Sequence, residues 1–503
     1  MTRSAAEIAA GLAPARDARS IARGERIHVV GVAGAGASAA ALLAHAAGAI
    51  VDGCDPGVPS QYTPALDAAG IVVAGGHDAA HVAGLGPREA RLAVTKALTA
   101  VEPDHPELVA ARAAGLAIEA WQQVVADAAT GRRLVAVAGT HGKSTTAGWL
   151  THVLAGAGRD PSAFVGALLP ASVTGGVPGT ARIGTGPEFV VEADEYAGNF
   201  EPFRPVVAVV TGIEWDHPDV FADRAAVIAA FERWLLAAGE GSGGAEGPGP
   251  TLVANVADPG VVALLGRLGD RVGRVVRFGV AVPGGADLRA RIVSADPEGT
   301  SIDVEGLDGT RSVRLPTAGR HNVANALAVA GAALALGVPA SGISAGLESF
   351  PGIGRRLQRL GEAGGVVVYD DYAHHPTAIR ETIAAVRQRE PGRRLWAVYE
   401  PLTYHRTAAL LEEFATVLAT ADGVAIAEIW AGRDPDTTIA SAESLAAAVR
   451  TARRSVHSSA TGSPEETGRW LAERVRRGDA VLVMGGGRSY RIGEVLLESL
   501  ARP

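Results

Sequence analysis

Short apolar stretches alternate with alanine-rich, helix-like segments along most of this chain. The first apolar stretch, residues 27–31, leads into a glycine-rich turn, a helical segment at 39–47 and a second apolar stretch at 49–53. Two more strand-like stretches follow at 71–74 and 92–95. Strands that alternate with helices in this way predict a parallel sheet with crossover helices, the pattern of an α/β domain.

The same alternation begins again at two later points. An apolar strand at 133–138 opens a second series, with further strands at 189–191 and 206–211, and a third series starts near Pro351. A chain of 503 residues is long enough for about two to four domains. We therefore predict an α/β fold of three domains, made of residues 1–130, 131–350 and 351–503.

Two stretches interrupt the second series. Residues 239–250, GEGSGGAEGPGP, are rich in glycine and predict a flexible surface loop without chemistry of its own. Residues from about 285 to 316 alternate apolar and polar side chains around Asp-Gly turns. This period of two predicts a small excursion of β-strands within the second domain.

The overall composition argues against several classes of protein. A formal net charge of −8 disfavours a nucleic-acid-binding groove, which needs a basic surface. No apolar run reaches the length of about 18 residues that a membrane helix needs, and the N-terminus lacks the pattern of a secretory signal. The lone cysteine, Cys54, suits a reducing compartment. We expect a cytoplasmic protein that binds neither nucleic acid nor membrane.

Lysine is almost absent from the chain. Of 46 basic side chains only Lys96 and Lys143 are lysines, and arginine supplies the rest. A lysine that persists in such a composition indicates a place where a compact ammonium is needed, unless its survival is chance. Lys143 lies in the strongest phosphate-binding motif of the sequence, so we expect it to contact phosphate.

That motif follows the strand at 133–138 and precedes a helical segment. Its glycines allow backbone N–H groups to face phosphate oxygens, and the helix N-terminus adds a favourable dipole. Lys143 would neutralise the terminal phosphates, and the Ser144 hydroxyl would ligate Mg²⁺. The motif is tighter than the strict eight-residue pattern, which has glycine where this chain has Val137. It predicts an ATP site at Gly139, Thr140, His141, Gly142, Lys143, Ser144 and Thr145.

The first glycine-rich turn is a weaker signal. Gly34, Gly36 and Ala39 fit the dinucleotide fingerprint, and Asp55 lies at the right distance downstream to reach a ribose. Alone, this turn would indicate a dehydrogenase. A nicotinamide enzyme would not need a second phosphate loop a hundred residues later, however. Two nucleotide sites on separate domains favour a ligase, with one site for a nucleotide-linked substrate and one for ATP.

Further motifs resemble the Mur ligase family, over roughly residues 25–495. They occur in the family's order, and the last is the most specific. They are the acidic run EADE at 192–195, GIEWDHPD at 212–219, GRHNVANA at 319–326, GRRL at 354–357 and DDYAHHPT at 370–377.

The resemblance implies a three-domain enzyme that activates a carboxylate with ATP and Mg²⁺ and joins it to an amine through an acyl phosphate. The first domain would bind the UDP part of the substrate at Gly31, Gly34, Gly36, Asp55 and His77. Beyond the phosphate loop, ATP would contact His321, Asn322, Asn325, Arg356 and Asp370. The metal ligands would be Ser144, Glu192 and His217, and the catalytic residues Lys143, Glu192, His217 and Arg406.

The DDYxHHP run is similar to the branch of the family that joins L-alanine to UDP-N-acetylmuramate. A slightly changed run occurs in a second branch, which attaches a preformed murein peptide during wall recycling. The ending Tyr404-x-Arg406-Thr407 favours the first branch and a single amino acid as acceptor, although Leu402 stands where a histidine is usual. The resemblance implies an acceptor pocket at Tyr372, His374 and Arg406.

Other interpretations remain open at this point. A nucleotide-binding regulator that has lost catalysis would not need the intact set Lys143, Ser144, Glu192 and His217.

Some family members carry a carbamylated lysine as metal ligand. Lys96 precedes the phosphate loop and cannot take that role. The absence of such a lysine is typical of the alanine-adding branch. Helix starts, surface charge or a strand-to-helix corner would account for several of these side chains, and we expect Trp121 and Trp215 to be core residues.

Overall fold

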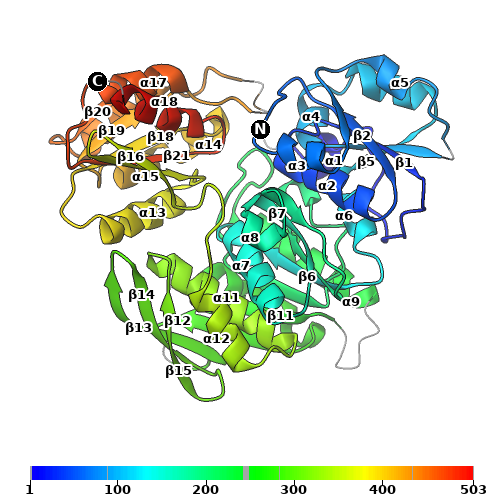
Figure 1. Ribbon diagram of the computed structural model, residues 1–503, viewed down its shortest axis with the longest axis horizontal. Coiled ribbons are helices and arrows are strands. Elements are labelled where there is room, and N and C mark those ends of the chain that lie inside the picture. Colours follow the sequence, from blue (N-terminus) through cyan, green and yellow to red (C-terminus); the bar gives the residue numbers. More distant parts are fainter. Residues whose placement is uncertain are drawn as a thin grey trace.

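The computed structural model describes residues 3–501 except 88, 242–248, 283, 433 and 435. Figure 1 shows three lobes around a common centre, coloured blue to cyan, cyan to yellow-green and yellow to red along the chain. Each lobe has its own sheet, of five, ten and six strands respectively. The α/β fold class is confirmed, and the boundaries predicted near residues 130 and 350 fall between the sheets.

The first sheet is parallel throughout, in the order β3-β2-β1-β4-β5. Its strands are β1 (Arg26–Val30), β2 (Ile50–Cys54), β3 (Val72–Ala74), β4 (Ala90–Val94) and β5 (Ala117–Ala120). The helices of this domain are α1 (Ala5–Ile8), α2 (Ala35–Ala46), α3 (Thr63–Ala68), η1 (Ala79–Val82), α4 (Lys96–Val101), α5 (Pro106–Ala113) and α6 (Trp121–Ala128).

Helix α2 begins earlier than the sequence predicts. The predicted start at Ala39 is wrong, because the helix already begins at Ala35, with Gly34 as its extended N-cap. Gly36 therefore lies inside the first turn of the helix. A Cβ on Gly36 would come within 2.2 Å of the Trp121 ring, so only glycine lets α2 and α6 approach this closely.

The central sheet has the order β15-β14-β13-β12-β11-β10-β6-β9-β7-β8. Its strands are β6 (Arg133–Ala138), β7 (Ser162–Leu169), β8 (Gly179–Arg182), β9 (Glu188–Glu192), β10 (Val207–Val210), β11 (Thr251–Asn255), β12 (Val275–Val280), β13 (Leu288–Asp296), β14 (Gly299–Glu305) and β15 (Thr310–Leu315). Its helices are α7 (Lys143–Gly156), α8 (Ala171–Thr174), η2 (Tyr196–Gly198), α9 (Arg224–Gly241), α10 (Pro259–Leu268), η3 (Gly269–Arg271), α11 (Arg320–Ala335) and α12 (Ala340–Glu348).

The predicted β excursion is confirmed: β13, β14 and β15 form an antiparallel extension of the central sheet. The prediction of a loop from residue 239 is wrong at its start, because α9 continues to Gly241. The rest of that predicted loop, residues 242–248, lies outside the described residues.

The third sheet has the order β16-β17-β21-β18-β19-β20, and only its edge strand β16 runs antiparallel to its neighbour. The strands are β16 (Gln358–Ala363), β17 (Val366–Asp371), β18 (Leu395–Glu400), β19 (Gly423–Ile426), β20 (His457–Ala460) and β21 (Ala480–Gly485). The helices are α13 (Pro376–Arg389), α14 (Tyr404–Ala409), α15 (Leu411–Leu418), α16 (Ala442–Ala452), α17 (Pro464–Ala472) and α18 (Tyr490–Ala501).

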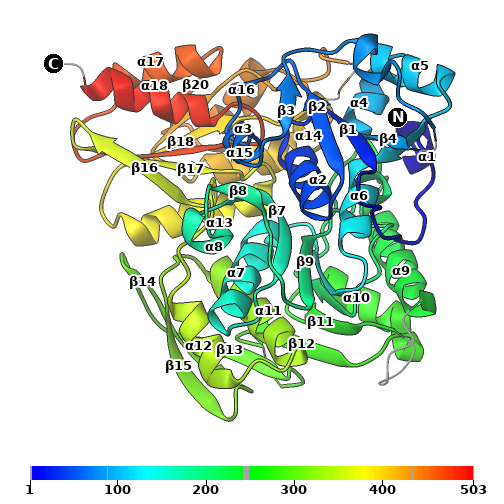
Figure 2. The ribbon, with the colours of Figure 1, turned by 45° about the vertical axis from the view of Figure 1, so that its right-hand side comes forward.

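The three domains touch one another through specific contacts. Helix α2 packs on β7 and β8 of the central domain, as Figure 2 shows, and the Ser38 and Thr180 hydroxyl oxygens lie 3.0 Å apart. On the other side, the Gln388 amide nitrogen of α13 donates to the Gly299 carbonyl oxygen at 2.9 Å, and the Gly319 N–H donates to the Gln388 side-chain oxygen. None of the described helices is long and apolar enough to cross a membrane.

Candidate active site

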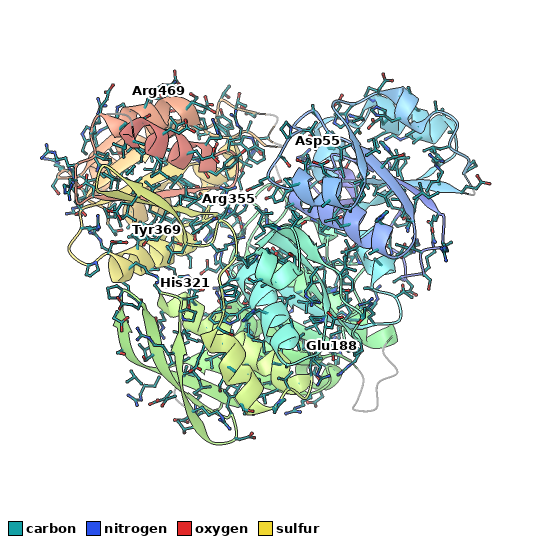
Figure 3. All side chains as sticks on the ribbon, viewed as in Figure 1. Asp55, Glu188, His321, Arg355, Tyr369 and Arg469 are labelled. Carbon is teal, nitrogen blue, oxygen red and sulfur yellow. The ribbon has the colours of Figure 1, made fainter. Side chains whose placement is uncertain are left out.

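A cavity of about 730 Å³ lies where the three domains meet. The first domain lines it with Gly36 and Trp121, the central domain with the phosphate loop and the start of α11, and the third domain with residues of β17 and α14. Figure 3 shows His321 and Arg355 on the sides of their domains that face the centre of the molecule. Since no single domain encloses this cavity, any chemistry in it depends on the closed arrangement.

The phosphate loop has the backbone geometry that its glycines predict. Gly139 and Gly142 both adopt positive φ, of 132° and 78°, and Gly142 is the N-cap of α7. A Cβ on Gly142 would lie 2.4 Å from the Asn325 side-chain oxygen. The loop is thus pressed against the start of α11, while the N-terminus of α7 faces the cavity and favours an anion there.

Lys143 lies among carboxylates in this loop. Its Nζ lies 3.0 Å from one carboxylate oxygen of Glu195 and 3.4 Å from one of Asp194, and its side chain is only 13% exposed. Burial disfavours the ammonium, but Glu195, Asp194 and Glu192 outweigh it and raise the pKa of Lys143. Lys143 therefore carries its charge at neutral pH and can neutralise an incoming phosphate.

Ser144 and Glu192 lie side by side, as the sequence predicts. The Ser144 hydroxyl donates to Glu192 at 3.0 Å, and the other Glu192 oxygen accepts from the Gly166 N–H at 2.6 Å. Arg356 of the third domain donates to the Ser144 hydroxyl at 2.8 Å. The second arginine of the GRRL motif thus reaches across the domain boundary to the phosphate loop.

The predicted metal ligands fall into two neighbouring groups. Ser144 and Glu192 form the first, whereas His217 groups with Asp194 and Glu195, whose ligand atoms all lie within 4.8 Å of one another. Both groups are rich in hard oxygen donors, which Mg²⁺ prefers. The residues present fit one or two divalent cations of this kind.

A buried ion pair joins the central and third domains beside these groups. Nε and one terminal nitrogen of Arg406 lie 2.8 and 2.7 Å from the same Asp216 oxygen, and both residues are almost fully buried. Burial opposes ionisation of Asp216, but Arg406 and His217 hold its pKa well below the usual range. The remaining Arg406 nitrogen is buried and makes no hydrogen bond with any described residue, although Arg406 lines the cavity.

A second polar cluster connects the phosphate loop with the DDYAHHPT motif. The Glu214 carboxylate is 3.0 Å from the His141 Nε2 and 3.4 Å from the His375 Nδ1, and it accepts from the Thr377 hydroxyl at 3.2 Å. Burial, together with His141, lowers the pKa of His375 to about 4. His375 is therefore neutral at physiological pH.

The predicted adenine-side residues lie at the start of α11. His321, Asn322 and Asn325 all line the cavity, and the Asn325 amide donates to the Asn322 side-chain oxygen at 3.1 Å. Burial and His141 lower the pKa of His321 to about 4, so its imidazole is neutral. A neutral ring and two amides can recognise a heterocyclic base without a charged partner.

The third-domain residues divide between the cavity and the layer behind it. Tyr372 and His374 line the cavity as predicted, but Asp370 does not. Its carboxylate accepts from the Arg355 Nε at 3.0 Å behind the cavity wall. The neighbouring Asp371 lines the cavity instead, because successive side chains of strand β17 point to opposite faces.

The first glycine turn, the predicted UDP site, lies mostly outside this cavity. Gly36 lines it, whereas Gly31, Gly34, Asp55 and His77 do not. Asp55 accepts from the Ala33 N–H at 3.1 Å and from the Gly57 N–H at 2.7 Å, so it shapes the turn itself. Trp121 packs against the core of the first and central domains, as expected, and it also lines the cavity, while Trp215 packs against the cores of two domains.

Several cavity residues have no role in the sequence-based assignment. They are Asp194, Glu214, Asp216 and Asp371, and each belongs to one of the motifs that resemble the family. The motifs signalled all four. The role of Asp371 depends on the direction of its side chain. The roles of the other three depend on partners more than 50 residues away, which their motifs do not contain.

One cavity residue and two residues next to the cavity lining hold unusual backbone conformations. His217, Arg355 and Thr403 have positive φ values of 56°, 56° and 66°. Such left-handed conformations cost a non-glycine residue roughly 1–2 kcal/mol each. Their neighbours hold them: Arg355 pairs with Asp370, His217 lies 3.3 Å from an Arg406 nitrogen, and the Thr403 N–H donates to the Trp430 carbonyl oxygen.

Comparison with known proteins supports the resemblance over the whole chain. Residues 26–133 match the model described as "Mur ligase family, catalytic domain", residues 137–333 "Mur ligase middle domain" and residues 355–487 "Mur ligase, glutamate ligase domain". Curated relatives include UDP-N-acetylmuramate–L-alanine ligases of Gloeobacter violaceus and Kineococcus radiotolerans. They are 37% and 38% identical and cover 95% and 96% of this chain and 97% of each relative.

Solved structures show the same architecture. A UDP-N-acetylmuramate-alanine ligase from Thermotoga maritima aligns with a TM-score of 0.74 at 24% identity, covering 94% of this chain and 98% of that one. A murein peptide ligase from Psychrobacter arcticus aligns with a TM-score of 0.71 at 26% identity, covering 95% and 99%. The three-domain fold is confirmed by both.

The neutral state of His375 predicts a pH dependence of stability. Its pKa of about 4 in the folded protein lies below its ordinary value of 6.5, so between these values the unfolded chain binds more protons. The free energy of unfolding should fall as pH drops from 6.5 to 4, with His375 contributing up to about 1.4 kcal/mol per pH unit. Urea unfolding of His375→Gln should show a shallower decline. The exposed control His45→Gln should follow the wild type. Equal slopes in His375→Gln and wild type would contradict the assignment.

Proposed function

Because the chain belongs to the Mur ligase family, we propose that it is the ATP-dependent ligase that joins L-alanine to the lactyl carboxylate of UDP-N-acetylmuramate, in the synthesis of peptidoglycan precursors. The observation that carries this proposal is the full-length similarity to curated L-alanine ligases, at 36–38% identity over at least 95% of this chain. The reaction forms ADP and phosphate. We place it in the cytoplasm, where ATP is available.

The first chemical step is transfer of the γ-phosphoryl group of ATP to the carboxylate, which yields an acyl phosphate and ADP. This brings a carboxylate against a triphosphate, so the barrier is largely electrostatic. Lys143 would bind the β- and γ-phosphates after exchanging its contacts to Glu195 and Asp194. The N-terminus of α7 would stabilise the same phosphates, and Arg356 would add a second cation from the third domain.

Mg²⁺, when bound by Ser144, Glu192 and His217, would neutralise charge on the phosphate oxygens. The protein's own contribution is to hold these ligands in place before the substrates arrive. The Gly166 N–H fixes the Glu192 carboxylate. Asp216 and His217, which share a loop of the central domain, lie beside Arg406 of α14. Positioning of this kind reduces the reorganisation that the transition state requires.

In the second step the amine of L-alanine attacks the acyl phosphate, and the tetrahedral intermediate collapses with loss of phosphate. The amino acid must present its amine toward the phosphorylated carboxylate, so its own carboxylate needs a partner on the far side. Arg406 would supply this partner through the terminal nitrogen that makes no hydrogen bond within the described protein. Tyr372, His374 and Leu402 line the same cavity.

The proposal is tested by the choice of acceptor. Purified protein with ATP and UDP-N-acetylmuramate should release phosphate when L-alanine is added and not with the murein tripeptide. A faster reaction with the tripeptide would instead assign the chain to the peptide-recycling branch.

A substitution of Arg406 tests the acceptor pocket within the alanine reaction. Arg406→Lys keeps a cation beside Asp216 but lacks the second terminal nitrogen of the guanidinium, so the KM for L-alanine should rise at least about tenfold.

The matched control for Arg406→Lys is the KM for ATP, which should change less than about twofold.

Leu402→His should alter the ratio of rates with L-alanine, L-serine, glycine and L-valine, since a pocket discriminates single methylenes by about 1–3 kcal/mol. Unchanged ratios would remove Leu402 from the acceptor pocket. An Arg406→Lys enzyme with the wild-type KM for L-alanine would overturn the role of Arg406.

Lys143→Arg should abolish the reaction although the charge is kept. The guanidinium is larger and planar, and the loop holds the ammonium between two carboxylates. We expect turnover below about a tenth of the wild type, a loss of at least about 1.4 kcal/mol of transition-state stabilisation. Lys96→Arg is the matched control, since Lys96 donates to the Ala197 carbonyl outside the loop and should retain most activity. Comparable turnover in the two variants would count against the loop assignment.

Activity should require a divalent cation of the hard class. Removal of Mg²⁺ with a chelator should stop phosphate release, and Mg²⁺ or Mn²⁺ should restore it, because the candidate ligands are mostly oxygens. His217→Ala should lower kcat more than it weakens binding of UDP-N-acetylmuramate, measured by calorimetry without ATP. Full activity in excess chelator would rule out the metal requirement.

A further inference from the structure

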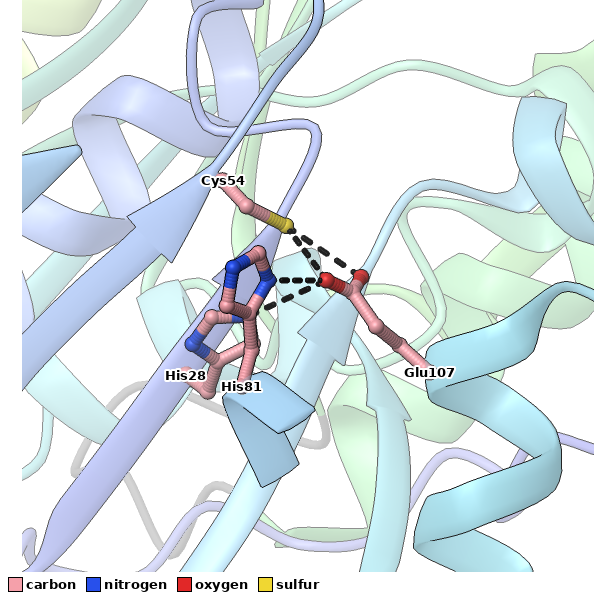
Figure 4. A group of neighbouring side chains, drawn as sticks. All are labelled: His28, Cys54, His81 and Glu107. Carbon is pink, nitrogen blue, oxygen red and sulfur yellow. Dashed lines mark hydrogen bonds and ion pairs between the residues drawn. The ribbon is translucent and has the colours of Figure 1, made fainter. Parts of the chain in front are cut away.

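A cluster of metal-ligand side chains lies in the first domain, apart from the cavity described above. Figure 4 shows His28, Cys54, His81 and Glu107 with their polar atoms directed toward one point. One ligand atom from each of the four lies within 4.8 Å of every other. None of the four lines the cavity at the domain junction, so the proposed ligase reaction leaves this cluster unexplained.

The fold brings these residues together from four elements. His28 lies on β1 and Cys54 at the end of β2, and the pairing register places both on the same face of the sheet. Helix η1 supplies His81 and α5 supplies Glu107. Three of the side chains are almost fully buried, while His81 is 25% exposed and leaves a route from solvent.

The distances suit a small ion. The Cys54 sulfur lies 3.0 Å from a Glu107 oxygen, and the same oxygen is 2.6 Å from the His81 Nδ1 and 3.9 Å from the His28 Nε2. Ligands of a tetrahedral Zn²⁺, with bonds of about 2.0–2.3 Å, lie about 3.3–3.6 Å from one another. The observed separations fall on both sides of that value, and small side-chain rotations would equalise them.

An independent observation comes from His28. Its side chain is 4% exposed, and its Nε2 is buried without a hydrogen bond to any described residue. The other ring nitrogen, Nδ1, is held by the Asp52 carboxylate at 2.5 Å. A carboxylate on one nitrogen fixes the tautomer and directs the lone pair of the other nitrogen outward, which is how metal-ligating histidines are commonly oriented. Here Nε2 faces the cluster, 3.9 Å from the Glu107 oxygen.

Two more histidines surround the second oxygen of Glu107. His77 Nδ1 lies 3.4 Å from this oxygen and 3.2 Å from the Cys54 sulfur, and His105 Nδ1 lies 3.9 Å from it. His105 is 1% exposed, and neither of its ring nitrogens has a hydrogen-bond partner among the described residues. Four of the chain's 13 histidines and its one cysteine thus converge on a single carboxylate.

We propose that His28, Cys54, His81 and Glu107 bind a Zn²⁺ ion, with Asp52, His77 and His105 as supporting residues around it. A thiolate with two imidazoles and one carboxylate is a donor set for a borderline-soft ion, and not for Mg²⁺ or Ca²⁺. All four positions of a tetrahedron are filled by protein, so the site is structural in type. On binding, the Cys54 thiol and the Nε2 of the His28 ring each lose a proton to solvent; burial opposes the charge on that ring, but Asp52 and Glu107 raise its pKa to about 9.

The ion would brace the turn that carries Gly31. The Cys54 carbonyl oxygen accepts from the Gly31 N–H at 2.8 Å and from the Val32 N–H at 3.2 Å. Bonds from one ion to β1, β2, η1 and α5 would therefore tie this turn to the face of the sheet beneath it. The site stands independently of the proposed ligase reaction.

Co²⁺ provides a specific test, because only a thiolate ligand gives cobalt an intense near-ultraviolet charge-transfer band and Cys54 is the only cysteine. The full-length protein, stripped of transition metals and kept in excess Mg²⁺ and ATP to occupy the oxygen-rich sites, would be titrated with Co²⁺. We expect the band to saturate at one ion per chain and to disappear on addition of one equivalent of Zn²⁺. Saturation without the band would overturn the proposal.

Variants separate the ligands from the rest of the chain. Cys54→Ser keeps a hydrogen-bond donor toward Glu107 but lacks the sulfur, and His81→Asn removes the most exposed ligand. Both should fold, as judged by circular dichroism, and both should bind Zn²⁺ at least about tenfold more weakly in competition with a chromophoric chelator. His45→Asn, an exposed histidine on α2 of the same domain, is the matched control and should bind like the wild type. Undiminished Zn²⁺ affinity in Cys54→Ser or His81→Asn would show that the cluster is held by hydrogen bonds alone.

Discussion

The buried ion pair between Asp216 and Arg406 is the contact on which the rest of the active site depends. It joins a loop of the central domain to the first helix after β18 in the third domain, with nitrogen–oxygen distances of 2.8 and 2.7 Å. An ion pair taken out of water stabilises a structure only when its geometry is good and its remaining hydrogen-bonding groups find partners. Here one guanidinium nitrogen has none within the described protein. A substrate carboxylate at that nitrogen would complete the pair, so acceptor binding and domain closure would reinforce each other.

Pairing with groups of opposite charge or with hydrogen-bond partners explains how so many charged groups share one cavity. Lys143 is balanced by Glu195 and Asp194, Ser144 by Glu192 and Arg356, and each contact brings together residues that are at least 48 positions apart. Burial keeps His321 and His375 neutral, with pKa values of about 4, so these rings recognise their partners as dipoles. Such an arrangement suits a reaction whose catalysis is mostly positioning and charge stabilisation, because water is excluded and the ligands are already oriented.

The sequence predicts the parts of this site that are local in the chain. The phosphate loop is a strand, a glycine turn and a helix in one continuous segment, and its backbone conformation follows from Gly139 and Gly142 alone. The choice between Asp370 and Asp371 could not be made in advance, since it depends on which face of β17 meets the cavity. The start of α2 was missed because Gly36 lowers helix propensity, and only the distant Trp121 accounts for its place in the helix. Arg406 and Asp216 each lie in a motif, but nothing in the sequence predicts that these two residues, 190 positions apart, form a pair.

The central claim is that the chain activates the carboxylate of its UDP-linked substrate with ATP, inside the cavity that the three domains enclose. The most direct measurement follows oxygen. UDP-N-acetylmuramate labelled with ¹⁸O in its lactyl carboxylate would be converted with ATP and L-alanine, and the released phosphate analysed by mass spectrometry. Attack of the carboxylate on the γ-phosphoryl group places one labelled oxygen in each phosphate formed. Unlabelled phosphate, with the amide nevertheless produced, would contradict an acyl phosphate and with it this account of the site.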